Sequence, residues 1–386
     1  MKIIKISTIP LSLNVLLKGQ LKYLSAYFEI IGISSSGKEL EEVREREGVR
    51  TIPVKMYRGI NPIGDLISLF NLYVIFKKEK PTIVHSITPK AGLLSMLAAL
   101  LAGVPLRMHT FTGLIFPTKR GVLKKVLIKM DQLLCWSATH IYPEGDGVKR
   151  DLQSFQITNK PLKVIANGNV NGIDLKYYSK EAISSLDLCT LKSFLEINEE
   201  DFVFIFVGRL VGDKGINELA AAFEQLPQEK VKLLLVGPME AELDPLSAKT
   251  LQILEKNNNI ISLGFQKDVR PYLHISHALV FPSYREGFPN VVMQAGAMEL
   301  PCIVTDINGA NEIILDGQNG TIIRSKDVES LKHAMLKIMQ DKVYYVKLRE
   351  KARALITSRY EQSLVWEAIL HEYRLVLTEK GISKHV

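Results

Sequence analysis

Short runs of consecutive apolar residues alternate along the chain with longer stretches of helical character. The short runs predict strands that are buried on both faces, and the longer stretches predict the helices that cover them. The predicted strands of the first half are Lys2–Ser7, Phe28–Ser34, Thr51–Lys55, Thr82–Ser86, Leu106–Thr110, His140–Tyr142 and Lys163–Ala166. Those of the second half are Phe202–Val207, Lys232–Val236, Ile260–Leu263, Ala278–Phe281, Cys302–Thr305 and Gly320–Ile323. Strands that alternate with helices indicate parallel sheets built from right-handed crossovers.

The length of the chain indicates two domains. It has 386 residues, and single cores seldom grow beyond ~250–300 residues. Two Asn-Gly turns between Asn167 and Asp174 mark the boundary. We therefore expect Rossmann-like domains over residues 1–170 and 171–361, the second entered through the polar stretch Lys176–Asp201. The expected helices include Ile63–Lys78, Gly92–Leu101, Ile216–Leu226 and Asp327–Gln340.

Targeting and redox signals are sparse. The longest apolar run, Ala91–Val104, is well short of the ~20 residues that a membrane-spanning helix needs, so it predicts a buried core helix. The N-terminus is too short for a signal peptide and predicts a first strand. Cys135, Cys189 and Cys302 are odd in number and widely spaced, which fits neither a disulfide framework nor a metal site. A reducing cytoplasm is the expected compartment.

Charge is unevenly distributed in a chain of ordinary globular composition, 47% hydrophobic and 23% charged, with a net charge of +8. Residues 1–170 hold 24 basic and 12 acidic residues, a net of +12. The remainder holds 25 of the 49 basic and 29 of the 41 acidic residues, a net of −4. A basic half favours nucleic acid, an anionic membrane or a phosphorylated substrate as partner. The chain has no nucleic-acid motif and no interleaving of basic and aromatic residues.

One basic stretch stands out, because Lys119–Lys129 holds five basic residues and no acid. Its apolar residues Val122, Leu123, Val126 and Leu127 can form a stripe with cations beside it. Such a helix can lie on an anionic membrane surface. A solvated helix face is the alternative.

The turn after the strand Ala278–Phe281 holds candidate binding residues. It reads Pro282-Ser283-Tyr284-Arg285-Glu286-Gly287-Phe288-Pro289-Asn290-Val291. Pro289 suits a first helical position, and the N–H groups of Asn290 and Val291 would then lack acceptors within the helix, which makes the helix start an anion site. Glu286 would repel a bare phosphate but can bind hydroxyl groups. Together these features predict a site for a phosphate that carries a sugar, whereas an ordinary strand–turn–helix junction is the alternative.

Two cations follow the first strand of the second half. Phe202–Val207 is followed by Gly208-Arg209-Leu210 and then by Asp213-Lys214-Gly215. Ligands of open α/β sheets bind beyond the carboxyl ends of the strands, so Arg209 and Lys214 are expected at the ligand edge. Arg can grip phosphate oxygens bidentately, and Lys acts as a compact charge. Solvated surface charge is the alternative.

These motifs resemble the donor site of the retaining GT-B glycosyltransferases of family 4. The family signature has a Glu, then Gly-x-Pro, then a second Glu eight positions after the first. Glu286, Gly287 and Pro289 match it, whereas Gln294 stands at the second acidic position. The run Pro81–Gly113 is similar to bacterial transferases of capsular and O-antigen polysaccharide. The resemblance implies α/β GT-B architecture, in which two Rossmann-like domains with parallel sheets face each other across a cleft and the C-terminal helix, about residues 362–380, packs back on the first domain.

The resemblance also implies roles for particular residues. Arg209 and Lys214 would hold the diphosphate, Glu286 would orient the sugar, and Gln294 would bind the ribose without a charge. His109 occupies the place of the family's cleft histidine and would contact the donor sugar or the acceptor, which makes it the fourth predicted catalytic residue. The predicted donor site comprises Gly208, Arg209, Lys214, Phe265, Glu286, Gly287, Phe288, Pro289, Asn290, Val291 and Gln294.

The acceptor side is predicted at Lys18, Gly19, His109 and Thr112. The loop Thr8–Gln20 has only Gly19 where the wider family often has a Gly-Gly pair, and Gly19 would permit close backbone approach. Gly264-Phe265 lies near the nucleobase in the family. Phe265 would either stack on that base or pack in the core. His85 is expected to be structural.

The reaction implied is retaining transfer of a hexose or N-acetylhexosamine from a nucleotide-diphosphate sugar, UDP-linked, to a polyprenyl-diphosphate-linked glycan in surface polysaccharide biosynthesis. It would take place in the cytoplasm, at the inner face of the cell membrane. No Asp-x-Asp element is present, so we expect metal independence and no cofactor. Two alternatives stay open: a nucleotide-sugar epimerase, which also uses two Rossmann-like domains, and a non-catalytic sugar-nucleotide-binding partner, which Gln294 would allow.

Overall fold

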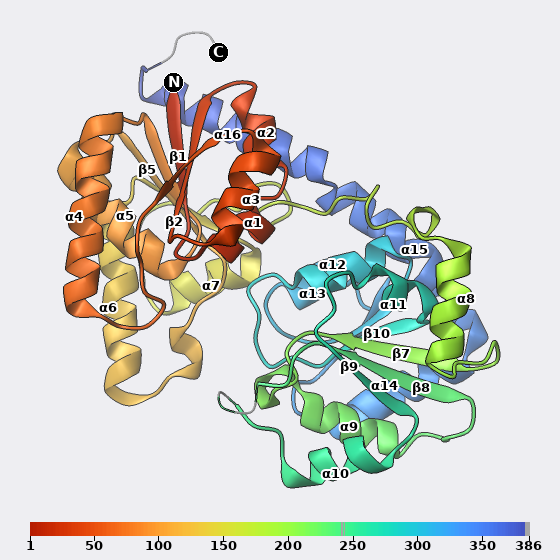
Figure 1. Cartoon of the computed structure of the whole chain (residues 1–386). Coiled ribbons are helices and arrows are strands. Elements are labelled where there is room, and N and C mark those ends of the chain that lie inside the picture. Colours follow the sequence, from red (N-terminus) through yellow and green to blue (C-terminus); the bar gives the residue numbers. More distant parts are fainter. Residues whose placement is uncertain (241, 243, 383–386) are drawn as a thin grey trace. The chain divides into compact units, whose positions relative to one another are not determined.

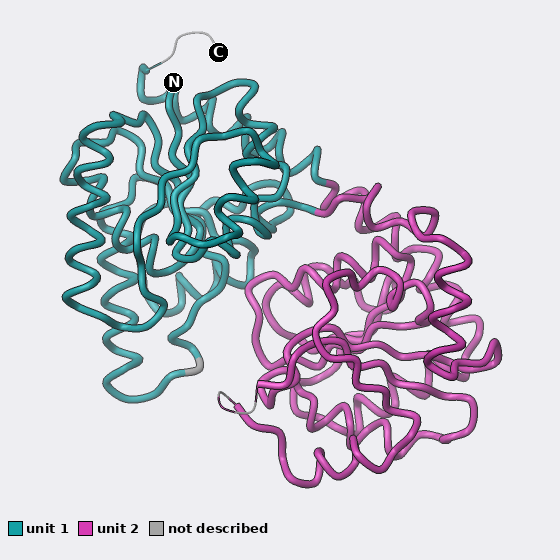
Figure 2. The backbone as a smooth tube through the Cα atoms, in the orientation of Figure 1, with its two compact units in different colours: residues 1–172, 362–386 teal, residues 173–361 magenta. Residues whose placement is uncertain are grey.

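A computed structural model describes residues 1–240, 242 and 244–382. The chain forms two compact units (Figures 1 and 2). Unit 1 comprises Met1–Gly172 together with the segment that begins at Gln362, and unit 2 comprises Ile173–Glu361. Each unit is built on one six-stranded sheet, and the neighbouring strands that the structure describes pair in parallel. The predicted α/β class with two Rossmann-like sheets is confirmed.

The sheet of unit 1 has the strand order β3-β2-β1-β4-β5-β6, which is the doubly wound order of dinucleotide-binding folds. The strands are β1 (Lys2–Ile6), β2 (Glu29–Ser34), β3 (Arg50–Pro53), β4 (Ile83–Ser86), β5 (Leu106–Phe111) and β6 (His140–Pro143). The helices are α1 (Pro10–Leu16), α2 (Gln20–Ser25), α3 (Lys38–Glu47), α4 (Pro62–Glu79), α5 (Pro89–Ala102), α6 (Gly121–Ser137), α7 (Asp146–Ser154) and α16 (Gln362–Glu379), with a 3-10 turn at Phe116–Thr118.

Unit 1 has a hydrophobic core on each face of its sheet, because side chains alternate along a strand. Ile4 of β1 belongs to the core beneath α4, α5 and α6. Its neighbour Ile3 belongs to the other core, where Val365 and Tyr373 of α16 pack with residues of α1 and α2. The last helix of the chain therefore completes the first unit.

The sheet of unit 2 repeats the same topology, with the order β12-β11-β10-β7-β8-β9. The strands are β7 (Phe202–Val207), β8 (Val231–Val236), β9 (Ile260–Gly264), β10 (Ala278–Phe281), β11 (Cys302–Thr305) and β12 (Gly320–Ile323). The helices are α8 (Ser185–Phe194), α9 (Ile216–Glu224), α10 (Ala248–Lys256), α11 (Arg270–Ile275), α12 (Asn290–Ala297), α13 (Ala310–Ile313), α14 (Val328–Gln340) and α15 (Lys342–Tyr360), with 3-10 turns at Lys180–Ala182 and Gly212–Lys214.

Two predictions of local structure were wrong, and a third segment contains a helix that was not predicted. Lys163–Ala166 is not a strand: only an isolated bridge joins Ile141 to Leu162, and Ala166 has a left-handed φ of 51° that ends any extended run. The predicted loop Thr8–Gln20 contains α1, whose first turn begins with Pro10. The polar stretch Lys176–Asp201 contains α8. Within the described residues, no helix is both long and apolar enough to cross a lipid bilayer.

The backbone contact at Gly215 generates a stability prediction. Gly215 has a φ of 72°, and a Cβ there would lie 2.1 Å from the carbonyl oxygen of Pro282. Gly215→Ala should therefore destabilise unit 2 by roughly 2–4 kcal/mol, because the clash of the new Cβ with the backbone adds to the strain of the left-handed conformation. Gly317→Ala is the matched control, because its φ is 68° and a Cβ would meet nothing within 4 Å. Thermal unfolding midpoints measure both, and equal losses would refute the clash.

Candidate functional site

The turns after β7 and β10 lie against each other at the carboxyl edge of the sheet in unit 2. The two strands are neighbours, and the Tyr284 N–H donates to the Asp213 carbonyl at 2.9 Å. The Ser283 hydroxyl, which is fully buried, lies 3.4 Å from the same carbonyl. Because Gly215 has no side chain, the backbone of the first turn can reach Pro282 in the second. These contacts bring together residues that are about 70 positions apart in the chain.

Lys214 and Glu286 form an ion pair across this junction. Their side chains are only 15% and 17% exposed. The Ser283 hydroxyl donates at 2.8 Å to Glu286 Oε1, the same oxygen that Lys214 contacts, and helps to fix the carboxylate. The structure therefore brings together two of the four predicted catalytic residues, and Ser283, which the sequence prediction gave no role, holds one of them in place.

Arg209 lies at the same edge, beyond the end of β7. Its guanidinium Nη1 is 2.9 Å from Glu240 Oε2 in the segment after β8, and the two side chains are 39% and 34% exposed. Gly208 adopts a φ of 155°, and a Cβ at Gly237 would lie 1.9 Å from the Gly208 carbonyl oxygen. The two glycines therefore let the turns after β7 and β8 approach closely enough for Arg209 to meet Glu240.

The start of α12 lies beside the Lys214–Glu286 pair. Pro289 is the residue before the helix rather than its first residue, a one-position correction, and Asn290 and Val291 open the first turn. The first N–H groups of a helix have no intrahelical acceptor and carry the positive end of its dipole. Gln294 is half-buried on the same helix, and its side-chain amide makes no hydrogen bond to any residue that the structure describes.

Two of the predicted donor residues, Phe288 and Gly287, make packing contacts within unit 2. Phe288 is 7% exposed, and its ring packs edge-on against Tyr360 at 5.5 Å between centroids. Gly287 lies where its carbonyl oxygen would be 2.3 Å from a Cβ on Gly309. Both residues shape the turn and position its neighbours. Phe265 differs, because its ring is 74% exposed at the end of β9, so the core-packing alternative was wrong.

His109 is fully buried inside unit 1. It lies within β5, its Nδ1 is 2.8 Å from the Ser86 hydroxyl, and a Cβ on Gly92 would lie 2.5 Å from its Cε1. Burial lowers the pKa of His109 to about 3, so the ring is neutral at physiological pH. Its Nε2 has no hydrogen-bond partner among the described residues. The structure thus does not bring His109 to the surface of unit 1.

The other predicted acceptor residues each make contacts within unit 1. The Lys18 carbonyl accepts from Asn171 Nδ2 at 2.9 Å. The close approach predicted at Gly19 exists, but Trp366 makes it: a Cβ at Gly19 would lie 2.7 Å from the indole ring. Thr112 donates to the Ile87 carbonyl at 3.0 Å. Lys18 and Gly19 therefore contact the last helix and its neighbours, whereas Thr112 follows β5.

A cavity of about 90 Å³ lies at the carboxyl edge of the sheet in unit 1. Its wall combines apolar side chains with three charged residues. Arg58 follows β3, Lys90 follows β4 and Asp131 lies on α6. Phe111 is also part of the wall and packs edge-on against His109 at 4.5 Å. Asp131 makes no hydrogen bond or ion pair within the described chain, and burial raises its pKa to about 7.

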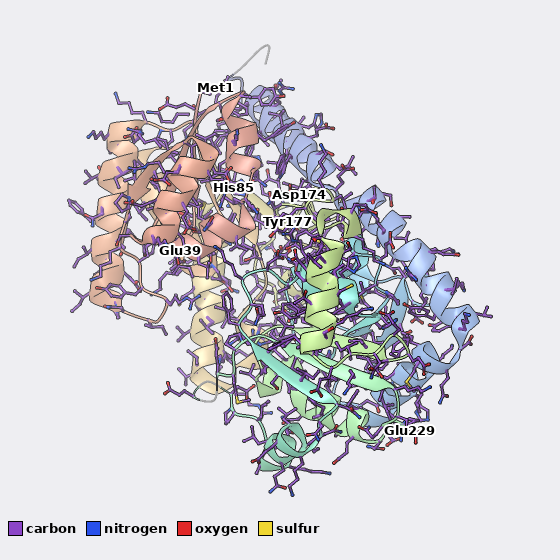
Figure 3. All side chains as sticks on the ribbon, turned by 45° about the vertical axis from the view of Figure 1, so that its right-hand side comes forward. Met1, Glu39, His85, Asp174, Tyr177 and Glu229 are labelled. Atoms are coloured by element: carbon purple, nitrogen blue, oxygen red, sulfur yellow. The ribbon has the colours of Figure 1, made fainter. Side chains whose placement is uncertain are left out.

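Sequence reasoning missed Glu240, Ser283 and Asp131. One signal was present, since Asp131 is the only acid between Lys119 and Ser137. Glu240 and Ser283 gave no such signal, because their roles depend on which turns meet in space. His85 was predicted to be structural, and it lies within unit 1 (Figure 3) with its ring nitrogens 2.6 Å from the Tyr373 hydroxyl and 2.8 Å from the Thr110 hydroxyl.

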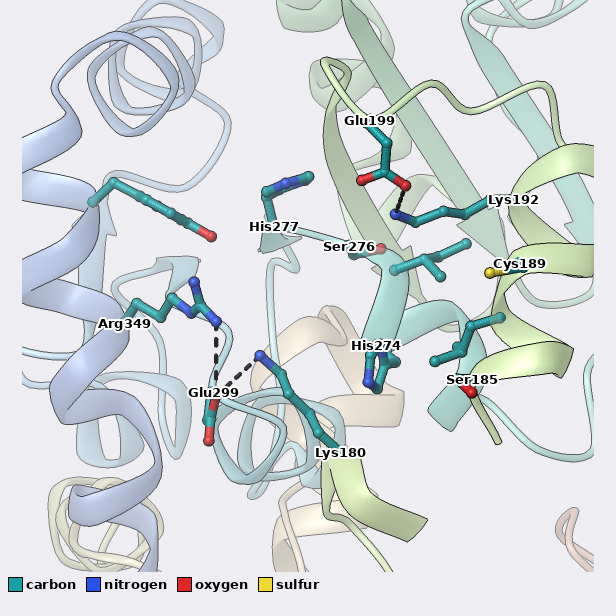
Figure 4. A pocket seen from close by; sticks show the side chains of 13 residues that line it. Lys180, Ser185, Cys189, Lys192, Glu199, His274, Ser276, His277, Glu299 and Arg349 are labelled. Atoms are coloured by element: carbon teal, nitrogen blue, oxygen red, sulfur yellow. Dashed lines mark hydrogen bonds and ion pairs between the residues drawn. The ribbon is translucent and has the colours of Figure 1, made fainter. Parts of the chain in front are cut away.

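A second cavity, of about 440 Å³, lies in unit 2 and is shown in Figure 4. Its charged side chains are paired with one another: Lys192 with Glu199 at 2.8 Å, and Lys180 with Glu299 at 3.0 Å. Glu199 precedes β7 and His277 precedes β10, so this cavity lies at the amino edge of the sheet. Arg209, Lys214 and Glu286 all follow their strands and belong to the opposite edge.

Comparisons with known proteins agree with this geometry. Residues 190–355 match the family model "Glycosyl transferases group 1", and residues 29–168 match "Glycosyl transferase 4-like domain". The chain is 30% identical over 383 residues, 98% of each protein, to the capsular polysaccharide biosynthesis glycosyltransferase CapM of Staphylococcus aureus. It is also 30% identical over 292 residues, 74% of this chain and 73% of the relative, to the UDP-Gal:alpha-D-GlcNAc-diphosphoundecaprenol alpha-1,3-galactosyltransferase of Escherichia coli.

Solved structures show the same fold. The Anabaena protein HepE, in complex with UDP and glucose, superposes with a TM-score of 0.81 at 17% identity, covering 97% of this chain and 99% of that one. With the two doubly wound sheets, the family-model matches and the full-length similarity to CapM, the conclusion is that this chain belongs to family 4 of the GT-B glycosyltransferases, among the bacterial enzymes of surface polysaccharide biosynthesis.

Proposed function

We propose that the protein transfers a hexose or N-acetylhexosamine from a UDP-sugar to a polyprenyl-diphosphate-linked glycan, with retention of anomeric configuration and without a metal ion. The observation that carries the proposal is that Arg209, Lys214 and Glu286 all lie at the carboxyl edge of one sheet, with Lys214 paired to Glu286 just before the start of α12. The Escherichia coli relative is named for a UDP-sugar donor and an acceptor linked to diphosphoundecaprenol. HepE was solved with UDP and glucose.

The donor site is arranged for a diphosphate that carries a sugar. Glu240 and Glu286 now occupy the positions around Arg209 and Lys214 that phosphate oxygens would take. A diphosphate that displaces Glu240 would gain a bidentate contact with Arg209. Glu286, which Ser283 holds in place, would then be free to accept hydrogen bonds from sugar hydroxyls. Exposed Phe265 offers a face for stacking on the base, and Gln294 offers an uncharged amide to the ribose.

The same groups would act in the transition state. Breaking the bond between the sugar and the diphosphate builds negative charge on the leaving group, and preorganised cations and helix amides stabilise that charge. Arg209, Lys214 and the first amides of α12 would do so in place of a divalent metal. No side chain is singled out as a covalent nucleophile. We therefore favour a same-face reaction, in which the departing phosphate accepts the proton of the acceptor hydroxyl.

The acceptor is assigned to the cavity of unit 1 that Arg58, Lys90 and Asp131 line. It lies beyond the carboxyl ends of β3, β4 and β5, where open α/β sheets bind ligands. Its apolar wall and adjacent cations suit a sugar joined to a lipid diphosphate. His109 would act through Phe111, which separates it from the cavity. The basic stretch of α6 would hold the enzyme at the cytoplasmic face of an anionic membrane, where such acceptors are found.

Substitution of Arg209 or Lys214 should reduce the stabilisation of the protein by UDP. At 100 times its dissociation constant, UDP should stabilise the wild type by roughly 2.7 kcal/mol. Arg209→Ala or Lys214→Ala removes a charge-assisted contact and should weaken binding roughly 10- to 100-fold, which leaves roughly 0.4–1.4 kcal/mol at the same UDP concentration. Thermal shifts without metal measure the effect. Lys230→Ala, which removes an exposed cation paired with Glu200, is the control, and an equal loss there would contradict the assignment.

Metal independence is tested by turnover. UDP release from a UDP-sugar, measured with a membrane lipid extract as the source of acceptor, should be unchanged by EDTA, because Arg209, Lys214 and the α12 amides supply the positive charge. Loss of activity in EDTA and recovery with Mg²⁺ would contradict the proposal. Conversion of the sugar to its epimer without any acceptor would favour an epimerase instead. Binding of UDP without any turnover would favour a non-catalytic sugar-nucleotide-binding protein.

The buried Asp131 should make the free energy of unfolding depend on pH. Burial raises its pKa to about 7, so the folded state holds a proton that the unfolded chain releases near pH 4. The free energy of unfolding should therefore fall as the pH rises from about 4 to 7, by at most about 1.4 kcal/mol per pH unit.

Asp131→Asn should remove that slope, so the variant gains on the wild type between pH 5.0 and pH 7.5. Thermal midpoints at the two pH values measure the gain. Asp187→Asn, at an exposed site, controls for the change in charge. If the wild type and Asp131→Asn depend on pH identically, Asp131 does not titrate in this range.

A further inference from the structure

Helix α4 turns a row of large apolar side chains toward solvent. The exposed residues are Ile63 (75%), Leu66 (68%), Ile67 (58%), Phe70 (62%) and Val74 (46%). Their spacing of three, four and seven positions places them on one side of the helix. A surface helix normally turns polar side chains to water, and contiguous apolar patches on soluble proteins mark interaction sites.

This row is not needed for the core of unit 1. The opposite side of α4 already supplies Leu72 and Phe76, both at most 1% exposed, to the core under the helix. Leu69, Tyr73 and Ile75 pack against the same core. The helix therefore has two apolar sides, one of which is satisfied within the unit.

The exposed charged residues on α4 and at its C-terminal end are positive. Of the two acids on α4, Asp65 lies 2.8 Å from Lys90 Nζ, and Glu79 is paired with Lys2 and Arg50. Lys77, Lys78 and Lys80, at the C-terminal end of α4, remain exposed. The solvent side of the helix thus combines apolar side chains with cations whose charge no acid of the helix neutralises.

Helix α6 repeats the combination on the same layer. It exposes Val122, Leu123 and Val126 at 77%, 43% and 41%. Helix α5 packs against both α4 and α6, and Figure 1 shows the three helices together on one side of the sheet. Exposed Ile60 and Ile115 line the cavity that also receives residues of α6. The basic residues that flank α6 or lie on it are Lys119, Arg120, Lys124, Lys125 and Lys129.

We propose that the apolar row of α4 (Ile63, Leu66, Ile67, Phe70 and Val74) inserts into the interfacial region of an anionic lipid bilayer, while the cations of α4 and α6 contact the headgroups. Charge complementarity selects this occupant. A second copy bound through the same face would bring these cations against one another, whereas anionic headgroups neutralise them. The inference deepens the proposed function by identifying how the enzyme meets its lipid-linked acceptor, but the donor chemistry does not enter it.

The test measures flotation with vesicles of phosphatidylcholine and phosphatidylglycerol. Ile67→Ser combined with Phe70→Ser should weaken partitioning about tenfold or more, because two large apolar side chains leave the lipid phase. The loss should persist at high salt, since insertion is apolar. Leu186→Ser combined with Phe194→Ser is the matched control on α8 of unit 2, where the two side chains are 74% and 79% exposed, and it should leave partitioning unchanged.

Three outcomes would overturn the proposal. The first is unchanged partitioning of the α4 variant, and the second is an equal loss in the α8 control. The third is a wild-type dimer in lipid-free buffer that the α4 substitutions convert to a monomer, which would assign the row to self-association. The thermal unfolding midpoint of each variant, measured without ligand, reports on its folding. Because vesicles of these two lipids contain neither donor nor acceptor, failure of the transferase proposal would leave the vesicle result standing.

Discussion

The close backbone contact between the turns after β7 and β10 is the constraint on which the proposed donor site depends. Neighbouring parallel strands place both turns at one edge, and the backbone contact between the turns keeps Lys214 and Glu286 close enough to form their ion pair. Gly215 removes the Cβ that would collide with Pro282, and the Asp213 carbonyl accepts from Tyr284. The fold places both turns at one edge of the sheet, and Gly215 lets their backbones come into contact.

The ion pairs at this edge keep in place the charged groups that a diphosphate would contact in the proposed donor site. Isolated cations that await a ligand would repel one another and, where half-buried, pay a desolvation cost. Pairing Lys214 with Glu286 and Arg209 with Glu240 lowers that cost and limits side-chain motion. Because Glu240 lies on the turn after β8, it can move away without disturbing a strand, whereas Ser283 holds Glu286 in place. In the proposed donor site, phosphate oxygens would then take the place of the Glu240 carboxylate.

The sheets were predictable from the sequence, and much of the site was not. Twelve of the thirteen predicted strands exist, because a parallel strand is apolar on both faces and its run of residues is a local property. Lys163–Ala166 failed where a left-handed Ala166 interrupts the run. The family motif located Arg209, Lys214 and Glu286. Their partners Glu240 and Ser283, the buried position of His109 and the solvent exposure of Phe265 depend on distant segments, which no local pattern records.

The exposed apolar side of helix α4 was also not predictable from the sequence. An apolar helix in sequence is normally taken as a buried one, and the side that faces solvent cannot be told from a pattern that is apolar on two sides. The excess of twelve positive charges in the first 170 residues does not determine the fold. It becomes informative because some of these charges lie on the helix that exposes Ile67 and Phe70. Hydrophobic contact alone would allow any apolar partner, and charge alone would allow any polyanion. Their combination on α4 and α6 selects a surface that is apolar within and anionic at its boundary, and a lipid bilayer has that structure.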